Sequence, residues 1–499
     1  MNLVEMIFDE GGKNPSKVAI KGLDFCYSYR EVAFAISNRY RELKRINLNK
    51  NDTVAIFLND GPLLYIYFYA IMAVGAIPVV LNPKSSAELI EFYINDLQPK
   101  LLISEHSIIT QHQVQKIIVE SDAIAEEWKL DCELINPVEK DETEILLIQY
   151  TSGSTGQPKG VIHTSQSVSA FCTSFALKTL QLKEEDIIYS VPKSFFGFGM
   201  GNSLLFPVFM RCTTVLDPKW PQVERIIRII SEANVTVFFG VPTIYREISK
   251  LPESNVFDKV RICFAAGAPL SYNIVCNWAK KYNHRIYNGI GSTELGHVFA
   301  SNYNISNELD NSCGVILTGW QYKILDVNNE PVSPGEKGVL LVKGKGKFKG
   351  YWKGSGFEYN KITSDEWYRT GDIFSIDKDQ GTLMFHGRED DRFKVKGRWV
   401  NPIEVEHSIT SSFPEVGECY TCPVEDGEGD QQSVLIVHGD TGEFDYEMQL
   451  RSILHNYQRP SLVIHLEQIP KNSNGKPDRS ALREIAQTAF DADLAKNNI

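Results

Sequence analysis

One short segment gathers the residue types that bind phosphate. Residues 150–160 read YTSGSTGQPKG and follow the apolar run Ile145–Ile148. Glycines let backbone N–H groups approach an anion closely, Ser and Thr hydroxyls add donors, and Lys159 can supply a positive charge. The segment is not a Walker A loop, because Gly160 follows the lysine where that loop has Ser or Thr. The residues alone leave two interpretations open: a phosphate-binding loop, or an ordinary flexible loop rich in Ser and Gly.

Four later segments also combine glycine with polar or charged residues. They are YNGIGSTELG at 287–296, YRTGD at 368–372, GREDDRFKVKG at 387–397 and PKNSNGKPDR at 470–479. With residues 150–160, and in this order, they resemble the motifs of the adenylate-forming superfamily, which includes acyl-CoA and aryl-CoA ligases, peptide-synthetase adenylation domains and luciferases. By this resemblance the ATP-binding residues are Thr151, Ser152, Gly153, Ser154, Thr155, Gly156, Lys159, Gly289, Gly291, Ser292, Asp372 and Arg388.

Several residues in these motifs have chemistry that suits the implied roles. Glu294, beside the hydroxyl of Thr293, is a hard oxygen ligand for a Mg²⁺ ion that bridges ATP phosphates; a solvated loop glutamate is the alternative. Asp372 can accept hydrogen bonds from both ribose hydroxyls, unless it is only a turn aspartate, and Arg388 offers a forked donor for ribose or phosphate. The resemblance makes Lys476, Glu294 and Thr293 the catalytic residues.

The resemblance implies a reaction in two steps. A carboxylate attacks the α-phosphorus of MgATP while Lys476 bridges the carboxylate and the α-phosphate, where negative charge develops. The C-terminal domain then rotates about a hinge at Asp390, which withdraws Lys476 and brings Lys396 and Gly397 to a thiol tunnel. The expected cofactors are ATP, Mg²⁺ and CoA, or phosphopantetheine on a carrier protein.

The segment Lys193–Pro207, KSFFGFGMGNSLLFP, is apolar and aromatic. Phe196 and Phe198 flank Gly197 and suit a flat aromatic ring; ordinary core packing is the alternative. By the resemblance, no Asp stands where amino-acid-activating domains hold the α-ammonium group, which disfavours an amino acid. The expected acid pocket consists of Phe196, Gly197, Phe198, Ala266, Gly267, Ile290 and His297.

Longer strings narrow the resemblance. FFGFGMGNSLLFP, FGVPTIY, GIGSTELGHVFASN and GREDDRFKVKGRWV resemble the benzoate–CoA ligase branch, and within it most closely the anthranilate–CoA ligases of bacterial alkylquinolone biosynthesis. His297 falls where this branch places a histidine beside the acid; a structural histidine bonded to backbone is the alternative. Ala265, Ala268 and Asn288 stand where polar or charged groups occur in the branch, so the resemblance implies a benzoate-like acid, with anthranilate the leading candidate.

Three functions stay open. The first is an aryl-acid–CoA ligase that acts on a small aryl carboxylic acid, and the second is a stand-alone ligase that loads a separate acyl carrier protein. The third is a ligase fold kept as a binding partner, which the departures Ser473, Asn474 and Pro477 in the last motif allow. The basic run VKGKGKFKG at 342–350 could hold CoA or a carrier, or be a solvated strand. By the resemblance we expect a monomer or homodimer.

Alternating apolar patterns indicate the elements that position these motifs. Strand-like Thr53–Leu58 precedes a helical pattern at 63–74, and Val235–Gly240 precedes Pro242–Lys250. Strands that alternate with helices favour βαβ units, so we predict an α/β fold: a large N-terminal domain of stacked, mostly parallel sheets at 1–388, with a β-rich subdomain at about 313–388. A small mobile α+β domain follows at 389–499, with the hinge near Asp390.

Composition and local patterns also limit the possible partners, the location of the protein and its metal sites. The chain has 499 residues, 51 Lys and Arg against 63 Asp and Glu, and a net charge of −12, which disfavours nucleic acid as a partner. Residues 63–81 carry no charge, but Gly75 and Pro78 interrupt them, so we expect a buried helix ending near Gly75 and a short strand rather than a membrane span. The start of the chain lacks the pattern of a signal peptide, which favours a cytoplasmic location. We interpret Cys419 and Cys422 as small apolar residues of a β-rich stretch rather than zinc ligands.

Overall fold

The computed structural model describes residues 2–119, 131–151, 157–303, 305, 312–354, 356–358, 362–413, 416, 418–426, 431–438, 446–470 and 477–497. The chain divides into two compact units. Unit 1 comprises Met1–Leu270, Ile274–Tyr322 and Val342–Tyr368, and unit 2 comprises Ser271–Asn273, Lys323–Leu341 and Arg369–Ile499. These bounds differ from the expected 1–388 and 389–499, and the hinge near Asp390 stays a prediction.

A nine-stranded sheet is the largest element of unit 1. Its order is β15 (Val315–Ile316), β14 (Val298–Ser301), β13 (Ile286–Gly291), β12 (Ile262–Ala265), β11 (Val237–Gly240), β9 (Ile187–Ser190), β10 (Thr213–Val215), β1 (Val18–Lys21) and β2 (Cys26–Ser28). The pairs from β13 through to β1 are parallel, whereas β13–β14, β14–β15 and β1–β2 are antiparallel. The prediction of a mostly parallel α/β fold is confirmed.

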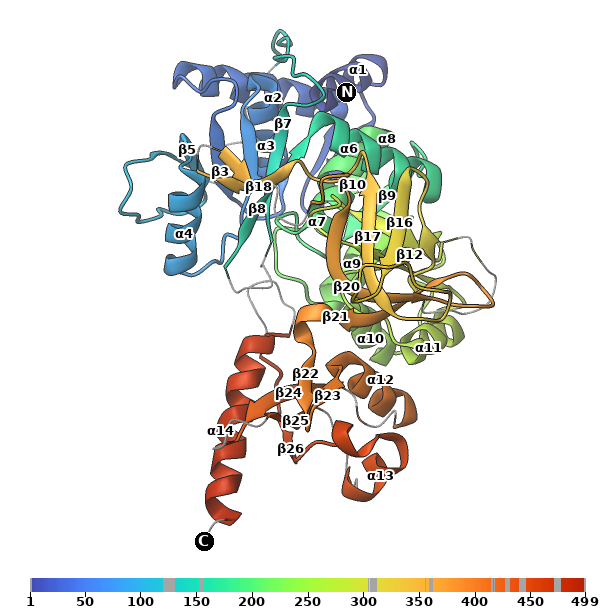
Figure 1. The fold of residues 1–499 in the computed structure, drawn as a ribbon. Coiled ribbons are helices and arrows are strands. Elements are labelled where there is room, and N and C mark those ends of the chain that lie inside the picture. The colour runs from blue at the N-terminus through green and yellow to red at the C-terminus, as the bar shows by residue number, and fades with distance from the viewer. Residues whose placement is uncertain are drawn as a thin grey trace. The chain divides into compact units, whose positions relative to one another are not determined.

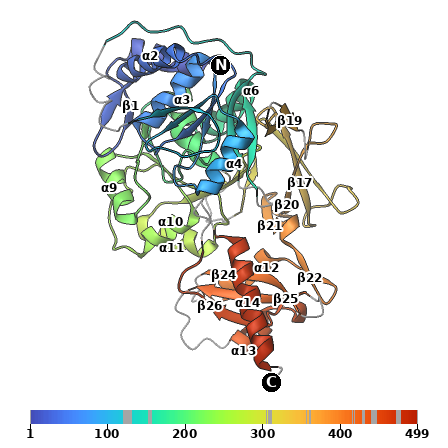
Figure 2. The same ribbon diagram turned by 90° about the vertical axis from the view of Figure 1, so that its left-hand side faces the viewer.

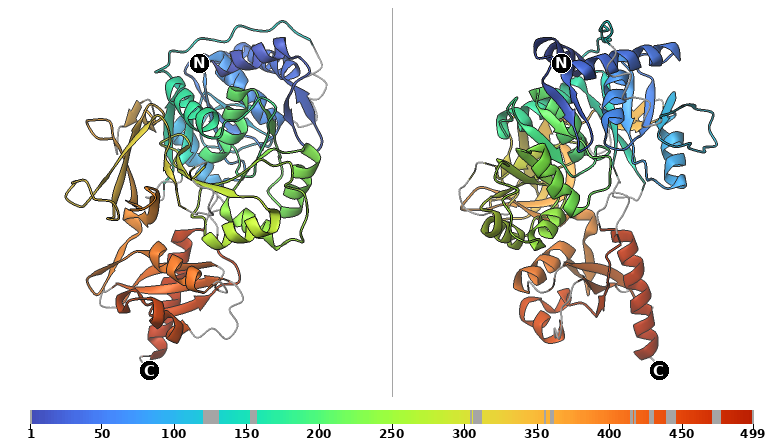
Figure 3. Two further views of the ribbon diagram at one scale, coloured as in Figure 1. Left: turned by 90° about the vertical axis from the view of Figure 1, so that its right-hand side faces the viewer. Right: turned by 180° about the vertical axis from the view of Figure 1, so that it is seen from behind.

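Three amphipathic helices cover one face of this sheet. They are α9 (Val223–Ala233), α10 (Pro242–Lys250) and α11 (Tyr272–Tyr282), drawn in green to yellow-green in Figures 1 to 3. Ile226 and Ile230 of α9, Ile248 of α10 and Trp278 of α11 join one buried cluster with Phe238 of β11. Removing this apolar surface from water holds the helices on the sheet.

Two four-stranded sheets complete the centre of unit 1. One is all parallel, in the order β4 (Ile77–Val80), β3 (Thr53–Phe57), β5 (Leu101–Ser104) and β6 (Gln115–Ile118), with α4 (Ala87–Leu97) packed on it. The other is antiparallel, in the order β19 (Gly356–Glu358), β18 (Gly350–Lys353), β8 (Lys159–Thr164) and β7 (Ile145–Thr151). We call this second sheet the loop sheet, because β7 and β8 flank the phosphate-loop motif.

Residues 63–81, which carry no charge, form the helix and the short strand that Gly75 and Pro78 predicted. Helix α3 runs from Pro62 to Val74, and Gly75 ends it in the left-handed region at φ 79°. A side chain at Gly75 would be strained, so a glycine suits this C-cap. Strand β4 follows after one residue. No helix among the described residues is both long and apolar enough to cross a membrane.

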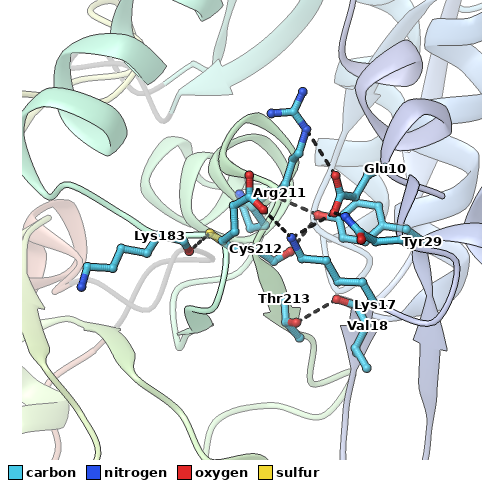
Figure 4. Close-up of polar contacts among 11 residues, drawn as sticks. Glu10, Lys17, Val18, Tyr29, Lys183, Arg211, Cys212 and Thr213 are labelled. Atoms are coloured by element: carbon cyan, nitrogen blue, oxygen red, sulfur yellow. Dashed lines mark hydrogen bonds and ion pairs between the residues drawn. The ribbon is translucent and has the colours of Figure 1, made fainter. Parts of the chain in front are cut away.

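The N-terminal helices are tied to the nine-stranded sheet by polar contacts. Helix α1 (Leu3–Lys13) packs on α2 (Tyr29–Arg45), which begins with a Ser28–Glu31 capping box. Glu10 of α1 lies 3.0 Å from Lys17 and 3.4 Å from Arg211, and the Tyr29 hydroxyl donates to the Cys212 carbonyl at 2.8 Å (Figure 4). Glu10 is buried, so these cations compensate its lost hydration.

Between residues 313 and 388 the described chain holds strands and no helix, as its composition predicted. Strands β16 (Trp320–Leu325), β17 (Gly338–Gly344), β20 (Tyr368–Ile376) and β21 (Leu383–Arg388) form a four-stranded sheet in this order. The β20–β21 pair is antiparallel, with Asp372 opposite Arg388.

The C-terminal part of unit 2 is a three-stranded sheet with helices on both faces. Its order is β24 (Glu418–Glu425), β25 (Gln431–His438) and β26 (Leu462–His465). Helix α14 (Arg479–Asn497) covers one face of the sheet (Figure 2). Its Leu482, Ala486 and Phe490 join a buried cluster there. On the other face lie α12 (Pro402–Ser412), α13 (Tyr446–Ile453) and the hairpin β22 (Phe393–Val395) to β23 (Arg398–Val400). Cys419 and Cys422 are buried on β24, as the apolar interpretation expected.

Candidate functional site

The loop sheet brings the two ends of the phosphate-loop motif together. Thr151 ends β7 and Lys159 begins β8, and the two residues are direct partners in the antiparallel pair. This pairing places Thr151 and Lys159 side by side at one end of the loop sheet. Ser152, Gly153, Ser154, Thr155 and Gly156 lie outside the described residues, so their role as phosphate donors stays a prediction.

The turn after β13 carries Thr293 and Glu294. Gly291 closes β13, and a Cβ there would lie 2.6 Å from the backbone oxygen of His297, so only glycine fits. Gly289 is equally confined, since a Cβ would lie 2.7 Å from the Phe264 ring. The Ser292 hydroxyl accepts a hydrogen bond from Leu295 N at 3.2 Å, which closes the turn. The glycines of this motif therefore shape the backbone that presents Glu294.

Two residues that the motifs do not include hold this turn. The Tyr351 hydroxyl donates to Glu294 Oε1 at 2.8 Å. His163 of β8 lies with Nε2 2.7 Å from the Thr293 carbonyl oxygen and Nδ1 3.2 Å from the Ser167 hydroxyl. Burial lowers the pKa of His163 to about 4, so the ring is neutral and donates from Nε2, because a carbonyl can only accept.

The expected acid residues Phe196, Gly197 and Phe198 lie where α7 (Gly197–Met200) begins. A π-helix, Gly201–Leu205, follows α7, and a second one, Cys172–Thr179, follows α6 (Ser165–Phe171). Single π-helical turns are rare and often occur at functional sites. Here Phe175 lies on one π-helix and Phe206 directly follows the other, and their ring centroids lie 5.7 Å apart.

His297 sits inside this aromatic group. Its ring centroid lies 5.0 Å from Phe175, 5.3 Å from Phe198 and 4.5 Å from Phe206. A Cβ at Gly201 would lie 2.8 Å from His297 Nε2, so the glycine makes room for the imidazole. The structure therefore joins His297 to Phe198, although 99 residues separate them.

The hydrogen bonds of His297 define which chemistry it can offer. Nε2 lies 3.3 Å from the Phe198 carbonyl oxygen, and Nδ1 is buried with no hydrogen-bond partner among the described residues. Burial lowers the pKa of His297 to about 3, so the ring is neutral. Because Nε2 must donate to a carbonyl, Nδ1 is left as an acceptor. Nε2 therefore bonds backbone, as the structural interpretation expected, and a contact between Nδ1 and the acid stays a prediction.

The remaining expected wall residues lie near the carboxyl ends of neighbouring parallel strands. Ala265 ends β12 opposite Asn288 of β13, and it is followed by buried Ala266 and then by exposed Gly267. Ligands of open α/β sheets bind at such ends. Asn288 donates from its side chain to the Ser312 carbonyl at 3.0 Å. Ile290 lies on β13 between the two confined glycines.

Sequence reasoning missed two buried polar residues near these elements. Gln149 is 2% exposed on β7, its Oε1 would lie 3.4 Å from a Cβ at Gly197, and its Nε2 has no hydrogen-bond partner among the described residues. Asp60, also buried, accepts hydrogen bonds from the backbone N and the hydroxyl of Ser194, both at 3.0 Å. Gln149 could have been noticed as the one amide in the apolar string ILLIQYT, whereas nothing in the sequence links Asp60 to residue 194.

In unit 2 the two expected ribose residues lie side by side. Asp372 of β20 and Arg388 of β21 are cross-strand partners, with Arg388 Nε 3.4 Å from Asp372 Oδ1. Asp390 lies in the 3₁₀ turn Glu389–Asp391 that links β21 to β22. Lys396 and Gly397 form the turn of the β22–β23 hairpin, both at positive φ (50° and 76°). Lys476 lies outside the described residues.

These features together define a class of protein. The largely parallel α/β unit carries the Ser/Thr/Gly-rich motif with Lys159 and the turn that presents Glu294. In the second unit, Asp372 is paired with Arg388. This is the arrangement of an adenylate-forming enzyme. The model of the AMP-binding enzyme family matches residues 7–352, and the chain belongs to this family.

Curated relatives and solved structures agree with this assignment. The chain is 36% identical to an anthranilate–CoA ligase of Pseudomonas aeruginosa, over 92% of both proteins. It is 29% identical to a 4-hydroxybenzoate–CoA/benzoate–CoA ligase of Rhodopseudomonas palustris, over 93% of this chain and 90% of that protein. The fold is similar to the anthranilate CoA ligase AuaEII in complex with anthranoyl-AMP (TM-score 0.87, 24% identity, 98% of each chain). It is also similar to a benzoate CoA ligase from Burkholderia xenovorans LB400 (TM-score 0.86, 24% identity, 97% of this chain and 100% of the other).

Proposed function

We propose that this protein is an aryl-acid–CoA ligase of the benzoate and anthranilate type, which forms an acyl-adenylate from ATP and then a thioester. The observation that carries the proposal is the neutral His297 in its group of phenylalanines, beside the turn that holds Glu294. Aromatic faces and edges favour a flat ring over an aliphatic chain. The names of the curated relatives support the same reaction.

His297 also favours a class of ring substituent. Its free Nδ1 accepts a hydrogen bond, so it suits a substrate N–H or O–H and not an ionised carboxylate. A 2-amino or 2-hydroxy group supplies such a donor. This favours anthranilate over benzoate, although Ala265 and Ala268 offer no polar side chain.

The residues present fit magnesium. Among the described parts of the chain, no three His, Cys, Asp or Glu side chains gather into a metal cluster. Mg²⁺ is commonly bound by one or two carboxylates together with phosphate oxygens and water, so Glu294 alone is a sufficient protein ligand. When bound, the ion would neutralise phosphate charge. Lys159 would add a second positive charge, Asp372 would accept from ribose, and Lys476 would stabilise the charge that develops at the α-phosphorus.

Pyrophosphate release from ATP, measured over a series of acids, tests the proposal. We compare 2-aminobenzoate, 2-hydroxybenzoate, 2-methylbenzoate and benzoate, because the methyl group matches the amine in size but donates no hydrogen bond. We expect the amine or hydroxyl acid to be preferred over the methyl acid by about 5- to 13-fold, since one hydrogen bond contributes about 1 to 1.5 kcal/mol. His297→Phe keeps a ring in place and should remove this preference.

The thiol acceptor is tested in the same system. We expect CoA to be consumed and an aryl-CoA thioester to appear. Transfer only to a phosphopantetheinylated carrier protein would identify the carrier-loading ligase instead. No pyrophosphate release with any acid would refute ligase activity and favour the binding-partner alternative.

A further inference from the structure

Glu294 is held by a tyrosine that no sequence motif pointed to. Tyr351 lies on β18, is 5% exposed, and donates its hydroxyl hydrogen to Glu294 Oε1 at 2.8 Å. A carboxylate only accepts hydrogen bonds, so the direction of this bond is fixed. It occupies one carboxylate oxygen and leaves Oε2 for another partner.

Hydrogen bonds also hold the backbone at Thr293 and Glu294. The Glu294 carbonyl accepts a hydrogen bond from Phe348 N at 2.7 Å, and the Thr293 carbonyl accepts one from His163 Nε2 at 2.7 Å. Phe348 lies just before β18, and His163 lies on β8. Because β8 and β18 are paired, with Tyr351 opposite Val161, two of the three contacts come from one sheet and the third comes from the residues that lead into it.

That sheet also carries the ends of the phosphate-loop motif. Lys159 begins β8, and its ammonium lies 5.5 Å from the centre of the Tyr351 ring. The tyrosine therefore touches both charged groups of the expected MgATP site: its ring faces the lysine and its hydroxyl faces the glutamate. A cation over an aromatic face is attracted by the negative charge of the ring face.

We propose that Tyr351 is a positioning residue that orients the Glu294 carboxylate toward the magnesium ion of MgATP. This inference rests on the proposed function, because that function makes Glu294 the metal ligand. Hydrogen-bonded partners of metal ligands fix ligand orientation, and their loss commonly costs about 10- to 100-fold in metal affinity or activity. The competing explanation is that Tyr351 only packs, since its ring centroid lies 4.9 Å from that of Phe348.

Tyr351→Phe separates the two explanations, because it keeps the ring and removes the hydroxyl. We measure ATP binding to the full-length protein by titration calorimetry, once in saturating Mg²⁺ and once in EDTA. We expect about 10- to 100-fold weaker ATP binding in Mg²⁺ and unchanged binding in EDTA. Equal affinity of wild type and variant under both conditions, or an equal loss under both, would overturn the proposal.

Two further variants sharpen the result. Tyr29→Phe also removes one buried tyrosine hydrogen bond of 2.8 Å, to Cys212, and should leave ATP binding unchanged in both buffers. In Glu294→Gln, adding Tyr351→Phe should cause no further loss of Mg²⁺-dependent affinity, because the tyrosine acts through the glutamate. A full additional loss would show that Tyr351 acts on another group.

The assay needs neither acid nor CoA, so it distinguishes failure of this inference from failure of the proposed function. Wild-type protein that binds ATP without any dependence on Mg²⁺ would refute the metal-ligand role and the inference with it. Wild-type binding that depends on Mg²⁺, together with an unaffected Tyr351→Phe, would refute the inference alone.

Discussion

Substitution of Gly197 by alanine should change which acids the enzyme accepts without unfolding it. Gly197 begins α7, and an added Cβ would lie 3.4 Å from Gln149 Oε1 and 3.7 Å from Thr293 Oγ1, both ordinary contact distances. Helical Ala is more favourable than Gly by about 0.5 to 1 kcal/mol, so stability should stay the same or rise slightly. The new methyl group stands beside the residues expected to line the acid pocket.

The size of the effect follows from that placement. A difference of one methylene in an apolar pocket discriminates between substrates by about 10- to 200-fold. We therefore expect the Gly197→Ala enzyme to lose at least about tenfold in kcat/KM for ring-substituted benzoates relative to a short aliphatic acid. The variant should change the size of the acid that the enzyme accepts and leave ATP binding unchanged.

Two other glycines supply contrasting controls. A Cβ at Gly199 would lie 2.5 Å from the Lys193 carbonyl carbon, a backbone atom that cannot move aside, so Gly199→Ala should lower the melting temperature through overpacking of about 1 to 3 kcal/mol. Gly12→Ala in α1 adds a methyl group that meets nothing within 4 Å, so it should leave the acid preference unchanged and keep or slightly raise the melting temperature, as Gly197→Ala should.

Initial rates of pyrophosphate release across benzoates of increasing bulk, with calorimetric melting of each variant, provide the measurement. An unchanged order of acid preference in Gly197→Ala would remove this residue from the acid pocket. A uniform loss with every acid would point to damage at the ATP site instead.

Three further outcomes are expected. Lys476→Ala should abolish adenylate formation yet leave thioester formation from supplied acyl-adenylate largely intact, and equal loss of both half-reactions would contradict the role given to this lysine. Asp60→Ala leaves the buried Ser194 N–H without its acceptor and should lower stability by about 1 to 3 kcal/mol and raise KM for the acid, while Asp60→Asn, which keeps an acceptor oxygen, should be milder; equal melting temperatures of all three proteins would refute this. His163 and His297 have folded pKa values of about 4 and about 3, below about 6.5 in the unfolded chain, so the unfolded state binds protons first and stability should fall below pH 6.5 by up to about 1.4 kcal/mol per pH unit per histidine. Calorimetric melting from pH 7.5 to 5 measures this slope, which His163→Gln should reduce; the same slope in the variant would show that the ring is not buried neutral.

The local features were predictable because they depend on a few neighbouring residues. The helix at 62–74 ends at Gly75 since a glycine tolerates the left-handed C-cap, and the alternation of strands with helices predicted parallel sheets. The motif strings indicated an ATP site through their resemblance to the adenylate-forming superfamily, since the residues of 150–160 alone left an ordinary flexible loop open. The sequence also singled out Phe198, Glu294 and His297.

Distant contacts could not be predicted, because no local pattern specifies which far segments pack together. The Tyr351 hydroxyl reaches Glu294 across 57 residues, and His163 reaches the Thr293 carbonyl across 130. Which nitrogen of His297 is free depends on where the Phe198 carbonyl lies, 99 residues earlier in the chain. By itself the sequence determined the chemical groups and the class of fold that carries them; the tertiary structure decided which atoms those groups face, since orientation is set by packing against residues far along the chain.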